Sequence, residues 1–249
     1  MRRLALIVVA LGLGCGEAAA PEPPAPPEPA PQGMIAIPGA RFFLDRTPVT
    51  VAAFRASGRT TTAERLGGSV LDLRTGTWRI VQGATYEHPH GRDAEPAEDD
   101  EPATQISWDD ASAFCAARGA RLPTEREWEH AARNGRGDAT RYPWGDDLRE
   151  GGRWRANVWQ GPFPTANTME DGWLYASPVG AFPPTPIGLV DMVGNVWQWT
   201  SSAFDATQRV IRGGSYLCDH DVCHGYRIDA REGVTPDSSL MHVGFRCAR

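Results

Sequence analysis

Two cysteines with four residues between them, Cys218 and Cys223, are the strongest candidates for chemistry in this sequence. They lie in the stretch GGSYLCDHDVCHGYR, which also contains His220 and His224. A loop this short can bring two Cα atoms within reach of a disulfide. Two thiols can also act as a redox pair, and cysteines together with histidines can bind zinc. The spacing alone leaves all three alternatives open.

The N-terminus bears on this choice because it indicates where the chain is sent. Residues 1–15 contain two arginines and then a short apolar run, well below the roughly 20 residues that span a bilayer. This pattern is typical of a signal peptide. Gly12, Leu13 and Gly14 before Cys15 resemble the lipobox of bacterial lipoproteins, in which the cysteine is lipidated. We therefore expect an exported lipoprotein of the bacterial cell envelope, touching the membrane only through its lipid; a soluble periplasmic or secreted protein is the alternative.

Residues 16–33 are rich in proline and are expected to form an extended, disordered linker. The remaining residues, 34–249, contain no repeat and no second linker, so we expect one domain. We also expect a monomer. A domain of this length can fold without help from metals or disulfides. The net charge is −6 and lysine is absent, which argues against nucleic acid as a partner.

Export also affects the cysteines, because thiols outside the cytosol tend to be oxidised. Four cysteines remain once Cys15 is set aside, and four cysteines can pair in three ways. From the residues alone, a disulfide is the first choice for the closely spaced pair. The four are Cys115, Cys218, Cys223 and Cys247.

Two helices are predicted from their capping residues. The first begins after Ser107, which forms a capping box with Asp110, and stops at Gly119. The second begins after Thr124 and stops at Gly135. The rest consists of short apolar stretches such as RVIRGGSY and HVGFRCAR, which predict short strands in a loop-rich α+β domain. The faces expected to be buried carry Ala111, Phe114 and Cys115 in the first helix and Trp128, Ala131 and Ala132 in the second.

Five motifs occur in a fixed order along the domain: RLPTEREWEHAAR, YPWGDD, GLVDMVGNVWQWTS, RVIRGGSY and TPDSSLMHVGFRCAR. Together they resemble the formylglycine-generating enzyme family, also called sulfatase-modifying factors. The resemblance runs from about Met34 to the C-terminus. It implies a single α+β domain, poor in regular structure, with a variant of the C-type-lectin-like fold.

The resemblance also implies an activity. Members of the family that act as oxidases use O2 to convert a cysteine in the CxPxR motif of a sulfatase into Cα-formylglycine. They bind copper(I) through a pair that matches Cys218 and Cys223, and copper(I) is a soft ion that prefers thiolates. The family also contains members without this chemistry. A catalytically silent protein that binds or scaffolds in the cell envelope is therefore the second hypothesis.

Further site residues follow from the same resemblance. Cys115 and Cys247 match a disulfide that ties the C-terminus to a helix. Ser215 matches an active-site serine. Trp197 and Arg227 match positions near the site, although Arg227 could instead pair with a carboxylate such as Asp229 or Asp237. Two features depart from the pattern: Val222 replaces a tyrosine that lines the site, and the loop before Asp45 is short.

Two structural calcium sites are also implied, since calcium takes six to eight oxygen ligands from loops. We expect the first to be occupied and the second to be weaker, because Gln198 replaces a glutamate there. Asx-turns without an ion are the alternative. The first site would use Asn157, Val158, Asp171 and Trp173, and the second Asp191, Gly194, Val196 and Gln198.

Overall fold

The computed structural model describes residues 29–219 and 223–249. The expected signal peptide with Cys15, most of the Pro-rich linker, and Val222 lie outside these residues. The described part contains four short helices and ten short strands. They are β1 (Met34–Ala36), β2 (Phe43–Asp45), α1 (Val51–Ala56), α2 (Thr62–Leu66), β3 (Gly68–Asp72), β4 (Thr77–Val81), α3 (Trp108–Ala117), α4 (Glu125–Ala132), β5 (Arg149–Glu150), β6 (Arg153–Trp154), β7 (Trp197–Ala203), β8 (Arg209–Arg212), β9 (Arg231–Val234) and β10 (Val243–Gly244).

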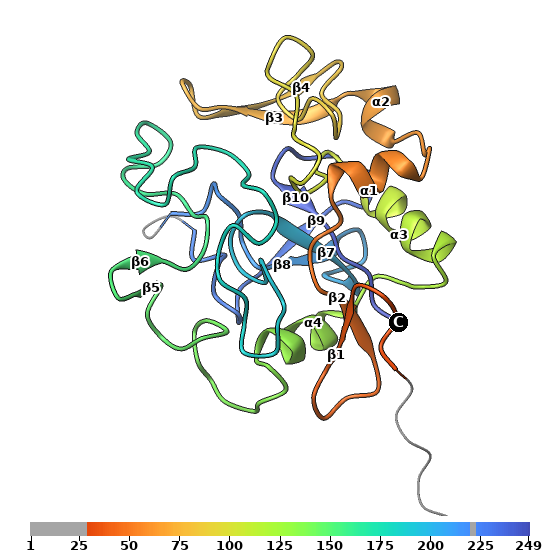
Figure 1. The fold of residues 1–249 in the computed structure, drawn as a ribbon. Helices are drawn as coiled ribbons and strands as arrows, with labels where there is room; N and C mark the ends of the chain where they lie inside the picture. Colours follow the sequence, from red (N-terminus) through yellow and green to blue (C-terminus); the bar gives the residue numbers. More distant parts are fainter. Residues whose placement is uncertain (1–28, 220–222) are drawn as a thin grey trace, which may run out of the picture.

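A four-stranded sheet forms the centre of the molecule. Its strand order is β10-β7-β8-β9; β10 pairs with β7 in parallel and the other pairs are antiparallel. Helix α4 packs against β7 and β8, and α3 packs against β7. In Figure 1 the helices lie to the right of and below this sheet, while the long loops between α4 and β7 lie to its left. Three two-stranded sheets complete the fold.

Helices α3 and α4 begin as their capping residues predict, and α3 ends just before Gly119; α4 ends at Ala132, earlier than the expected Gly135, because Asn134 already takes the left-handed conformation. Ser107 forms a capping box with Asp110, and Thr124 forms one with Glu127. Each box satisfies backbone N–H groups that the first turn leaves unpaired. Their buried faces are the expected ones, Ala111, Phe114 and Cys115 in α3 and Trp128, Ala131 and Ala132 in α4.

The main core lies between the central sheet, these two helices and the N-terminal segment. A smaller core forms under the β3–β4 hairpin, where Val70 and Leu71 pack with Trp159, Tyr216 and Leu217. The hairpin thus covers the segment that follows β8, which contains the closely spaced cysteines.

Cys115 of α3 and Cys247 near the C-terminus form a disulfide, the one that the family resemblance implied. Cys247 also donates its backbone N–H to Asp45, which pairs with Arg118 at the end of α3. The C-terminal segment is therefore fixed to both β2 and α3. None of the helices in the described part of the chain is long and apolar enough to cross a membrane.

Candidate functional site

The site begins where β8 ends, at two glycines that allow close backbone contact. Gly214 has a φ of +69°, and a Cβ there would lie 2.3 Å from the backbone nitrogen of Tyr226. A Cβ on Gly213 would lie 2.7 Å from the carbonyl oxygen of Met192. No side chain fits at either position without a shift of the backbone. Gly214 therefore brings the segment before Cys218 directly against the segment after Cys223, and Gly213 brings it against the Met192 backbone.

Cys218 and Cys223 are both free thiols, and their sulfur atoms lie 2.6 Å apart. Cys218 is buried and Cys223 is half-buried. The Sγ–Sγ distance exceeds the roughly 2.05 Å of a disulfide bond. The structure therefore describes an adjacent dithiol that points into the protein.

The two thiols are not equivalent. Burial raises the pKa of Cys218 well above its ordinary value, and hydrogen bonds from Ser215 only partly oppose this. The hydrogen bond with Cys218 lowers the pKa of Cys223. Cys223 is thus the first to become a thiolate, with Cys218 donating its S–H. Since the thiolate is the form that ligates metals and attacks, the half-buried sulfur is the more reactive.

The other predicted site residues surround this dithiol in part. Ser215 is fully buried; its carbonyl accepts the N–H of Cys218 at 2.9 Å and its hydroxyl accepts the N–H of Leu217. Trp197 lies beside Cys223, because a Cβ on Gly225 would meet both the indole, at 2.4 Å, and the Cys223 sulfur, at 2.9 Å.

Arg227 is turned to a different partner. It forms a two-pronged ion pair with the exposed Asp229, at 3.0 and 2.9 Å, which was one of the carboxylates considered for it. Its guanidinium is therefore engaged in a surface pair, and its role near the site stays a prediction. The same holds for Val222, which lies outside the described residues.

Two aromatic residues near the dithiol were missed from the sequence. Trp159 donates its backbone N–H to the carbonyl of Cys218 at 3.0 Å, and Tyr226 is buried against Gly214. Both line a cavity of about 440 Å³. Trp159 could have been suspected, because it directly follows the predicted calcium ligands. The cavity is lined by Asp147, Leu148, Arg149, Trp154, Val158, Trp159 and Tyr226.

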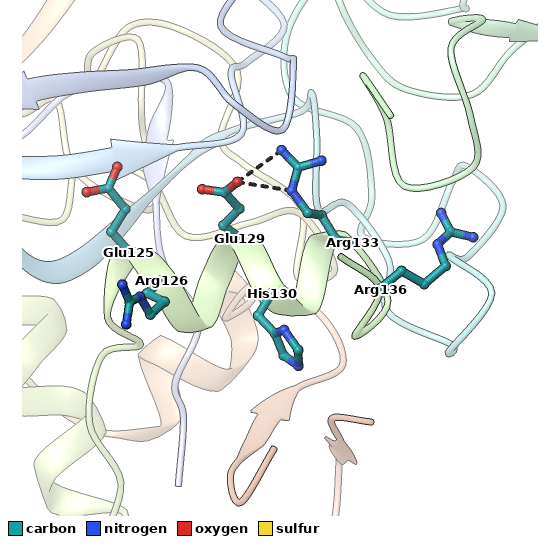
Figure 2. A pocket seen from close by; sticks show the side chains of 6 residues that line it. All are labelled: Glu125, Arg126, Glu129, His130, Arg133 and Arg136. Atoms are coloured by element: carbon teal, nitrogen blue, oxygen red, sulfur yellow. Dashed lines mark hydrogen bonds and ion pairs between the residues drawn. The ribbon is translucent and has the colours of Figure 1, made fainter. Parts of the chain in front are cut away.

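A second cavity, of about 420 Å³, runs along α4 and has a different character. Figure 2 shows its charged side chains, with Glu129 paired to Arg133. All of its lining residues are Arg, Glu or His, whereas the first cavity is lined mostly by apolar and aromatic residues. The connection of this second cavity to the dithiol is through Glu125 and Glu129, whose carboxylates accept hydrogen bonds from Arg212 at the end of β8. The lining residues are Glu125, Arg126, Glu129, His130, Arg133 and Arg136.

Two of the four residues predicted for the first calcium site, Asn157 and Asp171, present side-chain oxygens that fit the ion. The carbonyl of Val158 instead accepts a hydrogen bond from the Gln160 amide. The side-chain oxygen of Asn157 is buried and has no hydrogen-bond partner among the described residues. The Asp171 carboxylate is adjacent, since it accepts the N–H groups of Val158 and Trp173 at 3.0 Å. Burial raises the pKa of Asp171. An oxygen ligand left unpaired beside a carboxylate is what a bound calcium ion would satisfy.

The second loop is satisfied differently. The side-chain oxygen of Gln198 accepts hydrogen bonds from Trp128 at 2.9 Å and from Arg246 at 2.7 Å. Its amide nitrogen donates to the carbonyl of Asp191. An oxygen that already faces a guanidinium is a poor calcium ligand, because two cations would share one acceptor. Gly194 and Val196 are buried in the same loop, and the four residues as arranged do not fit the ion.

The dithiol is a two-sulfur donor set. Among residues 29–219 and 223–249, no group of three or more His, Cys, Asp and Glu is placed to hold a metal ion. Two adjacent thiols suit a soft ion of low coordination number such as copper(I). The fold and site thus define a loop-rich α+β domain with a partly buried, free dithiol between glycine-packed segments.

Comparison with known proteins identifies the family. The sulfatase-modifying factor enzyme 1-like domain family matches residues 7–249. The formylglycine-generating enzyme of Streptomyces coelicolor is 42% identical over 83% of this chain and 77% of its own. The inactive C-alpha-formylglycine-generating enzyme 2 of Bos taurus is 46% identical over 69% of this chain and 58% of its own. The chain belongs to the sulfatase-modifying factor enzyme 1-like family.

Solved structures agree on the fold. The structure of PvdO from Pseudomonas aeruginosa has a TM-score of 0.60 and 23% sequence identity, and the match covers 84% of this chain and 80% of that one. At this identity the likeness concerns the fold alone. The prediction of a single loop-rich α+β domain of the sulfatase-modifying type is confirmed.

Proposed function

We propose that this protein is an oxidase that converts a cysteine of a sulfatase into Cα-formylglycine. The observation that carries the proposal is the free, adjacent dithiol of Cys218 and Cys223 in a chain that is 42% identical to a formylglycine-generating enzyme. Relatives with that name support an activity on a peptidyl cysteine. The finer proposal is that the substrate segment carries CxPxR and that O2 is the oxidant.

Copper(I) is the cofactor we propose for the dithiol. Cys223 and Cys218 would hold the ion as thiolates; the lowered pKa of Cys223 favours its thiolate, and the proton of Cys218 would go to solvent when the metal binds. Copper would supply the one-electron chemistry with O2 that a spin-paired thiol lacks. Ser215 and Trp159 hold the backbone of Cys218 on either side, through its N–H and its carbonyl. Trp197 lies beside the Cys223 sulfur.

The substrate would lie over the dithiol as an extended segment. The cavity lined by Trp154, Trp159 and Tyr226 has a mostly apolar lining and adjoins Cys218 through Trp159. It would accept an apolar side chain near the target cysteine. Binding there would exclude water from the reacting thiol, which strengthens the interactions made inside the site.

Calcium at Asn157 and Asp171 would be structural. The ion would fix the loop that contains Trp159 and, through it, the position of Cys218. We also propose that the protein is exported and anchored by a lipid on Cys15. Metabolic labelling with a fatty acid tests this, because Cys15→Ala removes the acceptor and should abolish the label.

The oxidase proposal is tested with one peptide in two forms. The protein is loaded with copper(I), freed of excess metal, and incubated with O2, a thiol reductant and a CxPxR peptide. Mass spectrometry should show conversion of the cysteine to the aldehyde, and the matched peptide with serine in place of cysteine should stay unchanged. Cys218→Ser should convert neither. A protein that holds copper but leaves the peptide thiol intact would overturn the proposal.

A catalytically silent protein is the second candidate. The observation in its favour is the 46% identity to a relative named as inactive. In that case the dithiol has no need to stay reduced. Mass spectrometry of the untreated protein separates the two hypotheses: a Cys218–Cys223 disulfide that resists mild reduction favours the silent member, and two readily alkylated thiols favour the oxidase.

A further inference from the structure

Arg212 is the last residue of β8, immediately before the glycines that lead to Cys218. Its side chain is only 2% exposed. The guanidinium donates to Glu125 at 2.6 Å, to Glu129 at 2.9 Å and to the carbonyl of Ile228 at 2.5 Å. A buried cation with these three acceptors joins three segments of the chain at one point.

Arg212 precedes the loop that contains the two cysteines, and Ile228 follows it. The loop with both cysteines leaves the sheet after Arg212 and returns shortly after Cys223, reaching Ile228 before β9. The hydrogen bond from Arg212 to Ile228 therefore connects the two ends of that loop. The segments touch again at Gly214, whose missing Cβ leaves room for the backbone of Tyr226. Together the two contacts hold the two ends of the cysteine loop against each other.

Helix α4 holds the guanidinium from the other side. Figure 2 shows Glu125 and Glu129 projecting from the same side of the helix, one turn apart. Trp128 lies between them in the sequence, and the centroid of its ring is 5.4 Å from the central carbon of the Arg212 guanidinium. Glu125 also pairs with Arg231 of β9, and Glu129 with Arg133. The planar fork of arginine suits several acceptors at once, whereas a lysine ammonium is a single point charge.

We infer that Arg212 is a positioning residue that sets the distance between the two thiols by fixing both ends of their loop to α4. The inference builds on the role proposed for the dithiol. The pairing of Arg212 with Arg231 across β8 and β9 remains without this contact, but the loop beyond the sheet loosens and the effective concentration of one thiol at the other falls. Cys218 then also loses its protection from solvent.

The test measures the thiol–disulfide equilibrium of the dithiol in glutathione buffers, with the full chain and without copper, O2 or peptide. Trapping by alkylation and mass spectrometry gives the disulfide fraction. Arg212→Met should lower the equilibrium constant for disulfide formation at least about tenfold, which corresponds to about 30 mV. Arg212→Lys should show a smaller shift in the same direction. Arg231→Met is the matched control, because it removes another partner of Glu125 without touching Ile228, and should leave the equilibrium unchanged.

Circular dichroism and an intact Cys115–Cys247 disulfide establish that each variant is folded. A folded Arg212→Met with the wild-type equilibrium would overturn the inference, as would an equal shift in Arg231→Met. If Arg212→Met does not fold, the thiol–disulfide equilibrium is measured in Arg212→Lys and Glu129→Gln instead. A wild-type equilibrium in both variants would also overturn the inference. Failure of the oxidase proposal leaves this result standing, since no turnover is measured.

Discussion

The two pairs of cysteines in this domain differ in the length of chain that they enclose. Cys115 and Cys247 are 132 residues apart and are joined. Cys218 and Cys223 enclose a short loop and are free, with their sulfur atoms 2.6 Å apart. In the chain-entropy model a disulfide in the longer loop stabilises the fold by about 3 kcal/mol more than one in the shorter loop. By the same model a bond between the close pair would contribute about 2 kcal/mol, so leaving those two sulfurs unbonded for chemistry costs less folding free energy than leaving the distant pair unbonded.

Burial alone does not distinguish the pairs. Cys115, Cys247 and Cys218 are all buried, and what differs is the support around them. The joined pair ties α3 to a C-terminal segment that Asp45 also holds. The free pair is held by backbone contacts at Ser215 and Trp159 and by glycines packed against side chains. One pair stabilises the domain, whereas the domain stabilises the geometry of the other.

The largest expected effect follows from removing the joined pair. Cys115→Ala with Cys247→Ala should lower the free energy of unfolding by about 2–5 kcal/mol, because the unfolded chain regains the entropy of a long loop. Denaturant unfolding measures this. The reciprocal double variant, Cys218→Ala with Cys223→Ala, should cost about 1 kcal/mol and abolish copper binding. Equal losses of stability in the two double variants would remove the distinction between the pairs.

The next effect concerns the packing around the free pair. Gly225→Ala would place a methyl group 2.4 Å from the Trp197 indole and 2.9 Å from the Cys223 sulfur. We expect a loss of about 1–3 kcal/mol from overpacking, together with faster alkylation of Cys223. Gly137→Ala is the control, because a Cβ there meets nothing within 4 Å. Adding Trp197→Phe to Gly225→Ala should restore part of the stability, and a failure to do so would show that the indole is not the obstacle.

The sequence predicted the features that depend on near neighbours. The capping boxes at Ser107 and Thr124 are local, so both helices begin where expected. The family motifs identified the cysteines. The supporting contacts were not predictable, because they join distant residues: Arg212 reaches Glu125, and Arg246 donates to Gln198 in the loop for which a second calcium was expected. No local pattern shows which distant acceptor a buried arginine will find.

A smaller effect is expected from calcium. The Asn157–Asp171 loop supports Cys218 through Trp159, whereas the joined pair ties α3 to the C-terminal segment. Chelation should lower stability by about 1–2 kcal/mol at calcium concentrations some tens of times the dissociation constant, and should speed alkylation of Cys218. Calorimetric melting with and without chelator measures the first effect. Asp171→Asn should abolish the response and Gln198→Leu should retain it; a response lost in both would assign the ion to the wrong loop.

The smallest effect is a pH dependence of the folding stability that arises from His242, directly before β10. The backbone carbonyl of His242 accepts the N–H of Trp197, and its ring packs on Trp78 with a buried Nδ1 that has no partner in the described part of the chain. Burial lowers the pKa of His242 to about 3. Its folded pKa lies below the unfolded value of about 6.5, so the unfolded chain takes up the proton first. Stability is complete above pH 6.5 and falls as the pH drops toward 3. At pH 5.5 this single group should cost about 1.4 kcal/mol relative to pH 8.

His242→Gln should flatten that part of the stability profile, while the double variant of Cys115 and Cys247 should keep its slope and lie lower at every pH. If His242→Gln retains the full slope, the acid sensitivity belongs to another group, such as His90, whose pKa burial lowers to about 4.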